Sequence, residues 1–267
     1  MYFSINYYKV IMAEFIKTQI TDHIAYIGLD RGKSNAMHLE MLQELHAELL
    51  THQKNPAIEA LVLHGKEGFF SSGLDLITLY GYDEQTMLRF WEAFMDVIYG
   101  LSSFPKPVIA SITGHSPAGG CVLALCCDYR IMAEGDYVIG LNEVPVGIVV
   151  PHSIFALYSF WIGQPTAYKN LLEGKLLSPA EAHDIGLIDE ITSADRIHTL
   201  ATRKAKSWTQ FDRSAWGETK INLRQELLQK VKENKTEAIQ QVLEQWWRPS
   251  TRQILKTIID NLTKNRG

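Results

Sequence analysis

The stretch Ser116-Pro117-Ala118-Gly119-Gly120-Cys121-Val122 decides the fold when it is read together with the earlier stretch Ser72-Gly73-Leu74-Asp75. Each stretch is a glycine turn that follows a short apolar run and opens a segment with a helical pattern. The first N–H groups of a helix have no acceptor within that helix, so such turns present unpaired backbone donors. Two turns of this kind, brought together, form a preorganised pair of donors for one developing oxyanion. The two stretches therefore indicate chemistry on a carbonyl group.

Short strands alternate with helices around these turns, over the first two-thirds of the chain. Apolar runs and alternating patterns predict strands at residues 23–29, 60–64, 108–112, 129–133 and 137–140. Apolar residues at helical spacing predict helices at residues 38–52, 84–102 and 119–127, and from residue 154 onward. This order predicts an α/β fold with largely parallel strand pairing.

The last part of the chain changes to a polar, charge-rich helical pattern. We therefore divide the sequence into an N-terminal extension at residues 1–11, a core at residues 12–193 and a helical C-terminal region at residues 194–267. Apolar residues recur on faces of the C-terminal helices, namely Trp246, Trp247, Ile254, Leu255, Ile258 and Leu262. Contiguous apolar patches on otherwise polar helices are typical of interfaces, which favours an oligomer. The alternative is that these helices cover the core of their own subunit.

Composition narrows the function classes. The net charge is −4 and the basic residues are scattered, whereas a nucleic-acid-binding surface shows as a basic excess, so we expect no nucleic-acid partner. Cys121, Cys126 and Cys127 have neither the spacing of a zinc site nor that of a disulfide framework. We expect them to be core residues in a reducing compartment, and we expect no metal. No transmembrane span, signal or transit segment is evident, which predicts a cytoplasmic protein without a membrane partner.

Glu143 is the carboxylate of interest, because it lies in the apolar segment Gly140-Leu141-Asn142-Glu143-Val144-Pro145. Burial raises the pKa of a carboxyl group and makes it a better base near neutral pH. The alternative is that Glu143 caps a backbone N–H or pairs with a distant arginine. Asp75 follows the first glycine turn, where an aspartate more often caps a helix than takes part in catalysis.

A serine hydrolase is a weaker interpretation. Gly114-His115-Ser116-Pro117-Ala118 resembles a nucleophile elbow, but its last position is alanine. Pro117 also removes the N–H that would donate to the oxyanion. We therefore interpret Ser116 as a turn residue.

Three ordered motifs together resemble the enoyl-CoA hydratase/isomerase (crotonase) superfamily, over residues 13–264. They are Phe70-Ser71-Ser72-Gly73-Leu74-Asp75-Leu76, then Ser116-Pro117-Ala118-Gly119-Gly120-Cys121 with Cys127-Asp128-Tyr129-Arg130-Ile131, and then Gly140-Leu141-Asn142-Glu143. Asn35-Ala36-Met37 also matches the family's first turn on the CoA side. The resemblance implies a spiral of ββα units with a helical C-terminal trimerisation region, and hence a homotrimer or a hexamer.

The same resemblance implies a site for an acyl-CoA thioester. The thioester carbonyl would lie between the backbone N–H groups of Leu74 and Gly119. The substrate- and CoA-binding positions that it implies are Asn35, Ala36, Ser72, Gly73 and Asp75. CoA is part of the substrate, so no separate cofactor is expected. The aromatic candidates for the wall of the acyl pocket are Trp91, Phe94, Phe155 and Tyr158.

Hydratases of this superfamily use two glutamates, and this chain keeps one of them. The first position is Val122, which cannot hold or activate a water, and the second is Glu143. In its motifs the chain is similar to the mitochondrial-type Δ3,Δ2-enoyl-CoA isomerases, for which one base suffices. Glu143 would take the C2 proton of a 3-enoyl-CoA, the two N–H groups would stabilise the enolate, and Glu143 would return the proton to C4. The alternatives are a hydratase or another crotonase activity, and a non-catalytic acyl-CoA-binding homologue. RNA binding is disfavoured by the charge.

Overall fold

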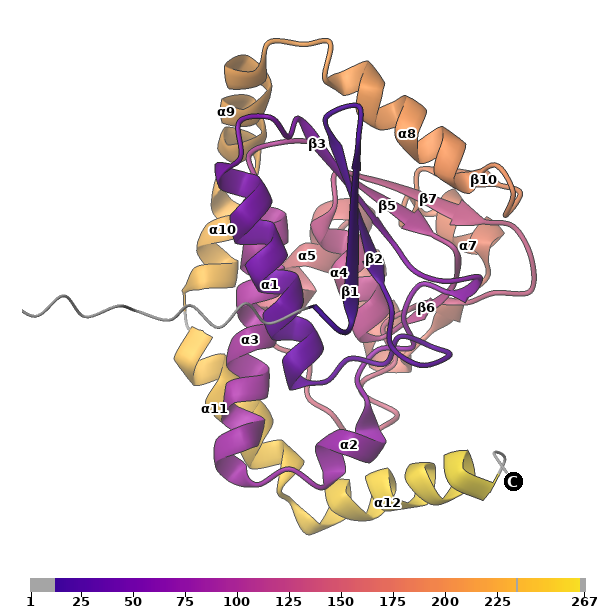
Figure 1. Ribbon diagram of the computed structural model, residues 1–267. Coiled ribbons are helices and arrows are strands. Elements are labelled where there is room, and N and C mark those ends of the chain that lie inside the picture. The colour runs from indigo at the N-terminus through magenta and orange to yellow at the C-terminus, as the bar shows by residue number, and fades with distance from the viewer. Residues whose placement is uncertain (1–12, 234, 265–267) are drawn as a thin grey trace, which may run out of the picture.

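Two strands followed by a helix form the repeating unit of the fold (Figure 1). The computed structural model describes residues 13–233 and 235–264. The strands are β1 (Ile16–Thr21), β2 (Ile24–Leu29), β3 (Ala60–His64), β4 (Gly68–Phe69), β5 (Val108–Ile112), β6 (Gly114–Pro117), β7 (Tyr129–Ala133), β8 (Ile139–Gly140), β9 (Leu176–Leu177) and β10 (Glu190–Thr192). The helices are α1 (Leu39–Lys54), α2 (Leu76–Tyr80), α3 (Glu84–Ser102), α4 (Gly119–Cys126), α5 (His152–Ile162), α6 (Gln164–Glu173), α7 (Pro179–Asp184), α8 (Ile197–Trp208), α9 (Arg213–Leu223), α10 (Gln225–Lys232), α11 (Lys235–Trp246) and α12 (Pro249–Lys264).

The strands form two sheets: the pairs β3–β4, β5–β6 and β7–β8 each contribute one strand to each sheet, whereas β1 and β2 both belong to the larger one. The larger sheet has the order β1-β2-β3-β5-β7-β10, and the smaller sheet has the order β4-β6-β8-β9. From β2 to β10 the larger sheet is parallel, while β1 pairs antiparallel with β2. Parallel neighbours need crossover connections, which the helices supply. The predicted α/β fold with largely parallel pairing is confirmed.

Both faces of the larger sheet are buried, since successive side chains of a strand point to opposite faces. On one face, Val62 and Ile109 pack with Leu200 and Ala201 of α8. The other face belongs to the main core, together with α1, α3 and α4. Figure 1 shows α8 on one side of the sheet and α1 and α3 on the other. Helix α4 is buried along its whole length, as its uniformly apolar sequence predicts.

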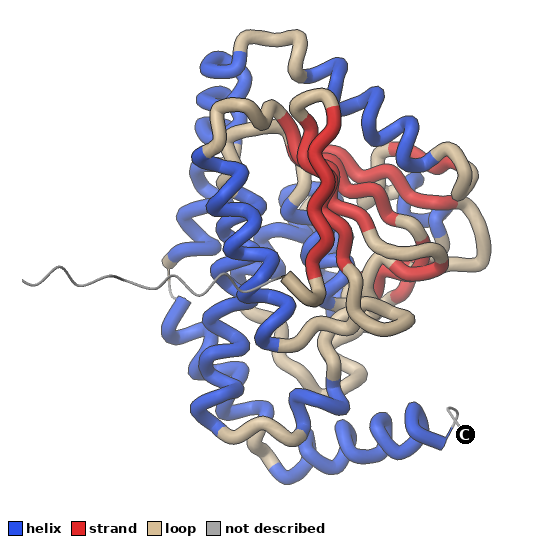
Figure 2. The backbone as a smooth tube through the Cα atoms, in the orientation of Figure 1, coloured by secondary structure: helices blue, strands red, loops and turns tan. Residues whose placement is uncertain are grey.

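The C-terminal helices cover much of their own subunit (Figure 2). α10 and α11 pack against α3, and α12 packs against α2. Trp246 and Leu255 are buried in the main core of this chain, so for these two residues the alternative holds that the helices cover their own subunit. The sequence pattern does not distinguish the two cases, because a helix buried by its own subunit and one buried by a partner carry the same apolar face. Ile254 and Leu262 remain exposed on α12.

The N-terminal extension at residues 1–11 lies outside the described residues. Within residues 13–233 and 235–264, no helix combines the length and the apolar character that crossing a bilayer requires.

Candidate active site

The two glycine turns, at residues 72–75 and 116–122, lie in contact. A Cβ atom added to Gly73 would lie 3.0 Å from the Cβ of Ala118 and 3.2 Å from the nitrogen of Gly119. Gly73 also has a φ of +87°, a conformation that favours glycine. A Cβ atom on Gly119 would in turn lie 3.4 Å from the Cα of Gly73. The two backbones therefore approach as closely as they do because both positions are glycine.

Several backbone N–H groups around this contact have an acceptor within the described residues, whereas the two predicted donors have none. The N–H of Gly73 donates to the Ser71 hydroxyl over 3.1 Å, and that of Asp75 donates to the Met37 carbonyl over 2.9 Å. The N–H of Ala118 donates to the Gly140 carbonyl over 2.7 Å. Within the described ranges, the N–H groups of Leu74 and Gly119 have no acceptor. Gly119 begins α4, so its N–H has no partner within the helix.

Ala118 holds the second turn in an unusual backbone conformation. Its φ of 48° and ψ of −123° lie in a region that alanine rarely adopts. Such strain costs on the order of 1–3 kcal/mol and persists only where surrounding contacts fix the backbone. Here those contacts are the bond to Gly140 and the packing of Gly73. They fix the direction of the following N–H group, that of Gly119.

Glu143 lies on the turn that follows β8, and Gly140 joins this turn to the second glycine turn. The carbonyl of Glu143 accepts hydrogen bonds from the N–H groups of Val146 and Ile148. The side chain is buried, with 8% of the residue exposed, and its Oε2 atom has no hydrogen-bond partner in the described part of the chain. Burial raises the pKa of Glu143 to about 7. Among the described residues, no arginine or lysine forms an ion pair with Glu143. Pairing with a distant arginine therefore does not explain why this carboxylate is buried.

Asp75 acts as the N-cap of α2, as its position after the first glycine turn predicts. Its carboxylate accepts from the N–H of Thr78 over 3.2 Å and pairs with Arg31 over 2.6 Å. Burial by itself favours the protonated form, but the hydrogen bonds from Thr78 and Arg31 outweigh it and lower the pKa of Asp75. The sequence does not single out Arg31, although its place directly after β2 puts it at the carboxyl edge of the parallel sheet.

The remaining predicted binding residues line the approach between β2 and the first glycine turn. Asn35 is buried, and its amide group accepts from the N–H of Arg31 and donates to the Phe70 carbonyl over 3.1 Å. The Ala36 carbonyl accepts from the Arg31 guanidinium over 2.7 Å. The Ser72 hydroxyl donates to that of Ser34. Asn35 thus holds the first turn in place through its own side chain, while Ala36 and Ser72 are half-buried beside it.

Ser116 lacks the partner that a nucleophilic serine needs. Its buried hydroxyl has no hydrogen-bond partner among the described residues, and His115 uses its Nδ1 atom to accept from the N–H of Val138. A serine nucleophile requires a base within hydrogen-bond reach. The arrangement favours the interpretation of Ser116 as a turn residue.

Val122 and the three cysteines fill the core behind the second turn. All four side chains are buried. Burial raises the pKa of each thiol, that of Cys126 to about 11, so the cysteines are protonated at neutral pH. In the described ranges, no group of three or more histidine, cysteine or acidic side chains is arranged to hold a metal ion.

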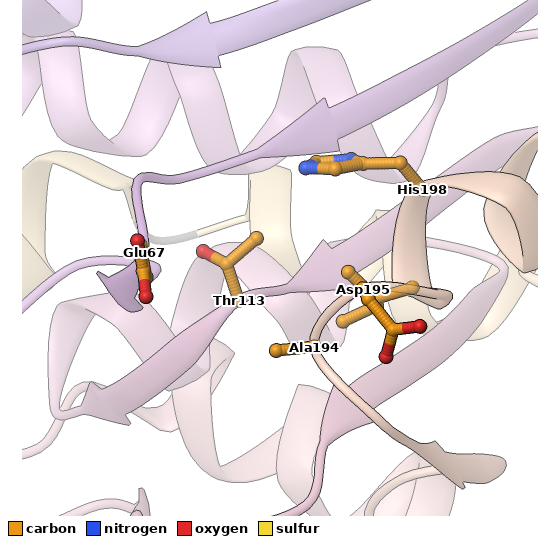
Figure 3. Close-up of a pocket in the computed structure, with 6 residues that line it drawn as sticks. Glu67, Thr113, Ala194, Asp195 and His198 are labelled. Carbon is orange, nitrogen blue, oxygen red and sulfur yellow. The ribbon is translucent and has the colours of Figure 1, made fainter.

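A separate cavity opens at the carboxyl edge of the larger sheet and shares none of the residues predicted for the site. It measures about 530 Å³. Figure 3 shows Thr113 between Glu67 on one side and Asp195 and His198 on the other. The Nδ1 atom of His198 lies 3.3 Å from the Ser111 hydroxyl oxygen. The glycine turns and Glu143, rather than this cavity, carry the geometry for carbonyl chemistry.

Comparison with known proteins identifies relatives over nearly the whole chain. The family model described as "Enoyl-CoA hydratase/isomerase" matches residues 19–260. "Enoyl-CoA delta isomerase 1, mitochondrial" of Rattus norvegicus is 33% identical over 246 residues, which are 91% of this chain and 85% of that protein. "Probable enoyl-CoA hydratase" of Bacillus subtilis is 29% identical over 203 residues, which are 73% of this chain and 78% of that protein.

Comparison with solved structures identifies proteins of the same kind. The crystal structure of human mitochondrial Δ3-Δ2-enoyl-CoA isomerase superposes with a TM-score of 0.92 at 26% identity, covering 95% of this chain and 100% of that one. The sequence motifs and the arrangement of the elements in space thus point to the same set of proteins.

Proposed function

Given that the chain belongs to the enoyl-CoA hydratase/isomerase family, we propose that it is a Δ3,Δ2-enoyl-CoA isomerase, which moves the double bond of a 3-enoyl-CoA to the trans-2 position. One observation carries the proposal: Glu143 is a buried carboxylate whose Oε2 atom has no hydrogen-bond partner among the described residues, on a turn that is hydrogen-bonded to the second glycine turn. The printed names of the relatives include both isomerases and hydratases. The residues of this chain favour the isomerase.

The reaction needs one base and one oxyanion site. The thioester carbonyl accepts hydrogen bonds from the N–H groups of Leu74 and Gly119. Ionised Glu143 removes a proton from C2, and negative charge develops on the thioester oxygen, where the two donors stabilise it. Protonated Glu143 then delivers the proton to C4, and the double bond shifts to C2–C3. A pKa near 7 suits both steps, because the group must accept and release the proton with little driving force.

Hydration would need a second acid-base group to hold and activate water. Val122 occupies the helix position that the superfamily resemblance assigns to such a group, and it is fully buried. An alkyl side chain offers no hydrogen bond to a water molecule.

We therefore expect the protein to isomerise 3-enoyl-CoA with a kcat/KM about 10²-fold or more above that for hydration of 2-enoyl-CoA, the usual contribution of one acid-base group. Steady-state assays with 3-hexenoyl- and 3-dodecenoyl-CoA against their 2-enoyl isomers provide the comparison. Equal kcat/KM values for the two reactions would instead favour the assignment as a hydratase. Binding of acyl-CoA without either reaction would indicate a non-catalytic homologue.

The proposed assembly is a homotrimer or a pair of trimers. Ile254 and Leu262 leave apolar surface exposed on α12, and closed cyclic symmetry would bury the same patch on every subunit. Light scattering at micromolar concentration is expected to give a mass of three or six chains of 30.3 kDa. The mass of a single chain would refute the oligomer. The cytoplasmic location stays a prediction.

A further inference from the structure

We propose that Thr251 and Arg252, two neighbours on α12, are positioning residues that fix the distance between the base and the oxyanion site. Thr251 binds the base turn, which we define as residues 143–148, and Arg252 binds α2, which continues the first glycine turn. The inference rests on the proposed function, in which Glu143 is the base and the N–H group of Leu74 is an oxyanion donor. It gives α12 a role in catalysis besides its proposed role in assembly.

Thr251 contacts the base turn through its hydroxyl group. The residue is 1% exposed, and its Oγ1 atom lies 3.3 Å from the carbonyl oxygen of Gly147. The Gln245 side chain donates to the same Oγ1 atom over 2.8 Å, which leaves the hydroxyl proton to be donated to Gly147. The next residue, Ile148, donates its N–H to the Glu143 carbonyl over 2.9 Å. A hydroxyl on α12 therefore holds the loop that closes on Glu143.

The base turn also packs directly on α12. Gly147 has a φ of +78°, and a Cβ atom there would lie 3.3 Å from Cδ1 of Ile254 and 3.6 Å from Cγ2 of Thr251. A side chain at Gly147 would press the turn away from the helix, whereas glycine allows the two to meet. The hydrogen bond from Thr251 thus lies within a close-packed contact rather than across open solvent.

Arg252 contacts α2 at the end away from the first glycine turn, and Figure 1 shows α12 beside α2. Its guanidinium donates to the Tyr80 carbonyl over 2.9 Å, and its Cζ atom lies 3.4 Å from the centre of the Tyr80 ring. Helix α2 has five residues, and the Leu79 N–H donates to the Asp75 carbonyl over 2.8 Å. A displacement of Tyr80 is therefore passed on to Asp75, the residue directly after Leu74.

The two contacts come from consecutive residues of one helix, so they move together. In the proposed reaction the thioester oxygen lies at the oxyanion donors while C2 and C4 lie at Glu143, so the substrate spans both turns. A misplacement of about 1 Å can slow a reaction on the order of 10²-fold. Thr251 and Arg252 would therefore act on the chemical step more than on substrate binding.

Thr251→Val tests the contact with the base turn, because valine keeps the branched shape of threonine and lacks its hydroxyl. We expect kcat to fall about tenfold while KM stays within about twofold. Thr251→Ser restores the hydroxyl and should recover most of the lost kcat. Thr257→Val is the matched control, because Thr257 is exposed on α12 and its hydroxyl donates to the Gln253 carbonyl of the same helix. The kcat of this control should equal that of the wild type.

Arg252→Met tests the contact with α2, because methionine keeps an unbranched side chain and lacks the guanidinium. Arg248→Met, at an exposed arginine just before α12, is its control. Arg252→Met should lose about as much kcat as Thr251→Val, and the double variant about as much as either alone. A link between two turns that is broken at one end has little left to lose at the other. Losses that multiply to about 10²-fold would show two independent packing effects and overturn the inference.

Amide hydrogen exchange gives a readout that needs no turnover. The N–H of Ile148 reports on the base turn and that of Leu79 on α2, while Leu63 in β3 serves as a reference within the sheet. Thr251→Val should speed exchange at Ile148, Arg252→Met should speed it at Leu79, and neither should change it at Leu63.

Three results would overturn the inference: unchanged exchange at both turns, a rise in KM without a fall in kcat, or no recovery of kcat in Thr251→Ser. If one of the single variants does not fold, the kcat, KM and exchange of the other decide. Faster exchange at the two turns of a protein that does not isomerise 3-enoyl-CoA would count against the proposed function and leave the link through α12 standing.

Discussion

Glu143→Gln is expected to fold normally and to isomerise 3-enoyl-CoA about 10²–10⁴-fold more slowly than the wild-type protein. Glutamine keeps the size and shape of the side chain but cannot accept the C2 proton. The resemblance places no other carboxylate at a catalytic position, so nothing nearby can substitute. Steady-state kcat with the best 3-enoyl-CoA substrate measures the loss. Retention of more than a tenth of the wild-type kcat would show that the base lies elsewhere.

Glu134→Gln serves as the matched control, because Glu134 is an exposed glutamate after β7. It removes one negative charge from the protein without touching the site. Its kcat is expected to equal that of the wild type. A similar loss in both variants would trace the effect to the net charge rather than to the base.

Glu143→Gln should also change how the stability of the folded protein depends on pH. The pKa of Glu143 in the fold, about 7, lies above the ordinary glutamate value of 4.5, so the folded state binds the proton more tightly than the unfolded state does. The stabilising effect of that proton is complete below about pH 4.5 and is lost as the pH rises through about 7, at a cost on the order of 3 kcal/mol. Glu143→Gln stays neutral, so it should unfold at a higher temperature than the wild type at pH 8.5 and at a similar one at pH 5. Thermal unfolding of both proteins at the two pH values checks the sign.

Gly73→Ala is expected to lower kcat about 10²–10³-fold, the usual result of losing one oxyanion donor. The new methyl group would lie 3.0 Å from the Cβ of Ala118 and 3.2 Å from the nitrogen of Gly119. Backbone atoms cannot rotate away as side chains do, so the two turns must separate. The N–H groups of Leu74 and Gly119 would then no longer converge on one oxygen. Parallel measurement of kcat and KM should place most of the loss in kcat.

Gly68→Ala is the control for backbone strain in this experiment. Gly68 has a φ of +81°, close to that of Gly73, but a Cβ atom there meets nothing within 4 Å. Both variants force alanine into a disfavoured conformation, and only one pushes the turns apart. Equal losses of kcat in the two variants would attribute the effect to strain alone and count against the paired-donor site.

The sequence predicts those elements whose boundaries depend on local chemistry. The ends of β3, β5, β7 and α3 agree with the prediction, because apolar runs stop at glycine, proline or polar residues. The strand β1 is not predicted: after Ile16 its residues are all exposed, so it has no apolar alternation. It exists because it pairs with β2 at the edge of the sheet, which is a tertiary effect.

The same distinction between local and tertiary signals applies to the residues of the candidate site. Glycine turns and a carboxylate in an apolar segment, here Glu143, can be recognised locally, whereas Leu74 and Gly119 are implied as the two donors only by the family resemblance. Their adjacency depends on the resemblance and on the packing of Gly73. Arg31 carries no local signal, because a charged residue after a strand is common. Its ion pair with Asp75 forms only when two distant segments meet.

The three protonated thiols behind the second turn have a consequence for how the protein can be studied. Alkylating reagents attack the thiolate, so Cys121, Cys126 and Cys127 react only when the core around α4 opens to solvent. The rate of their modification therefore reports how often the segment that begins with Gly119 unfolds locally. A ligand that binds only the closed form slows that modification in proportion to its occupancy. The core cysteines thus act as built-in reporters of the rigidity of the second glycine turn, without any label introduced at the surface.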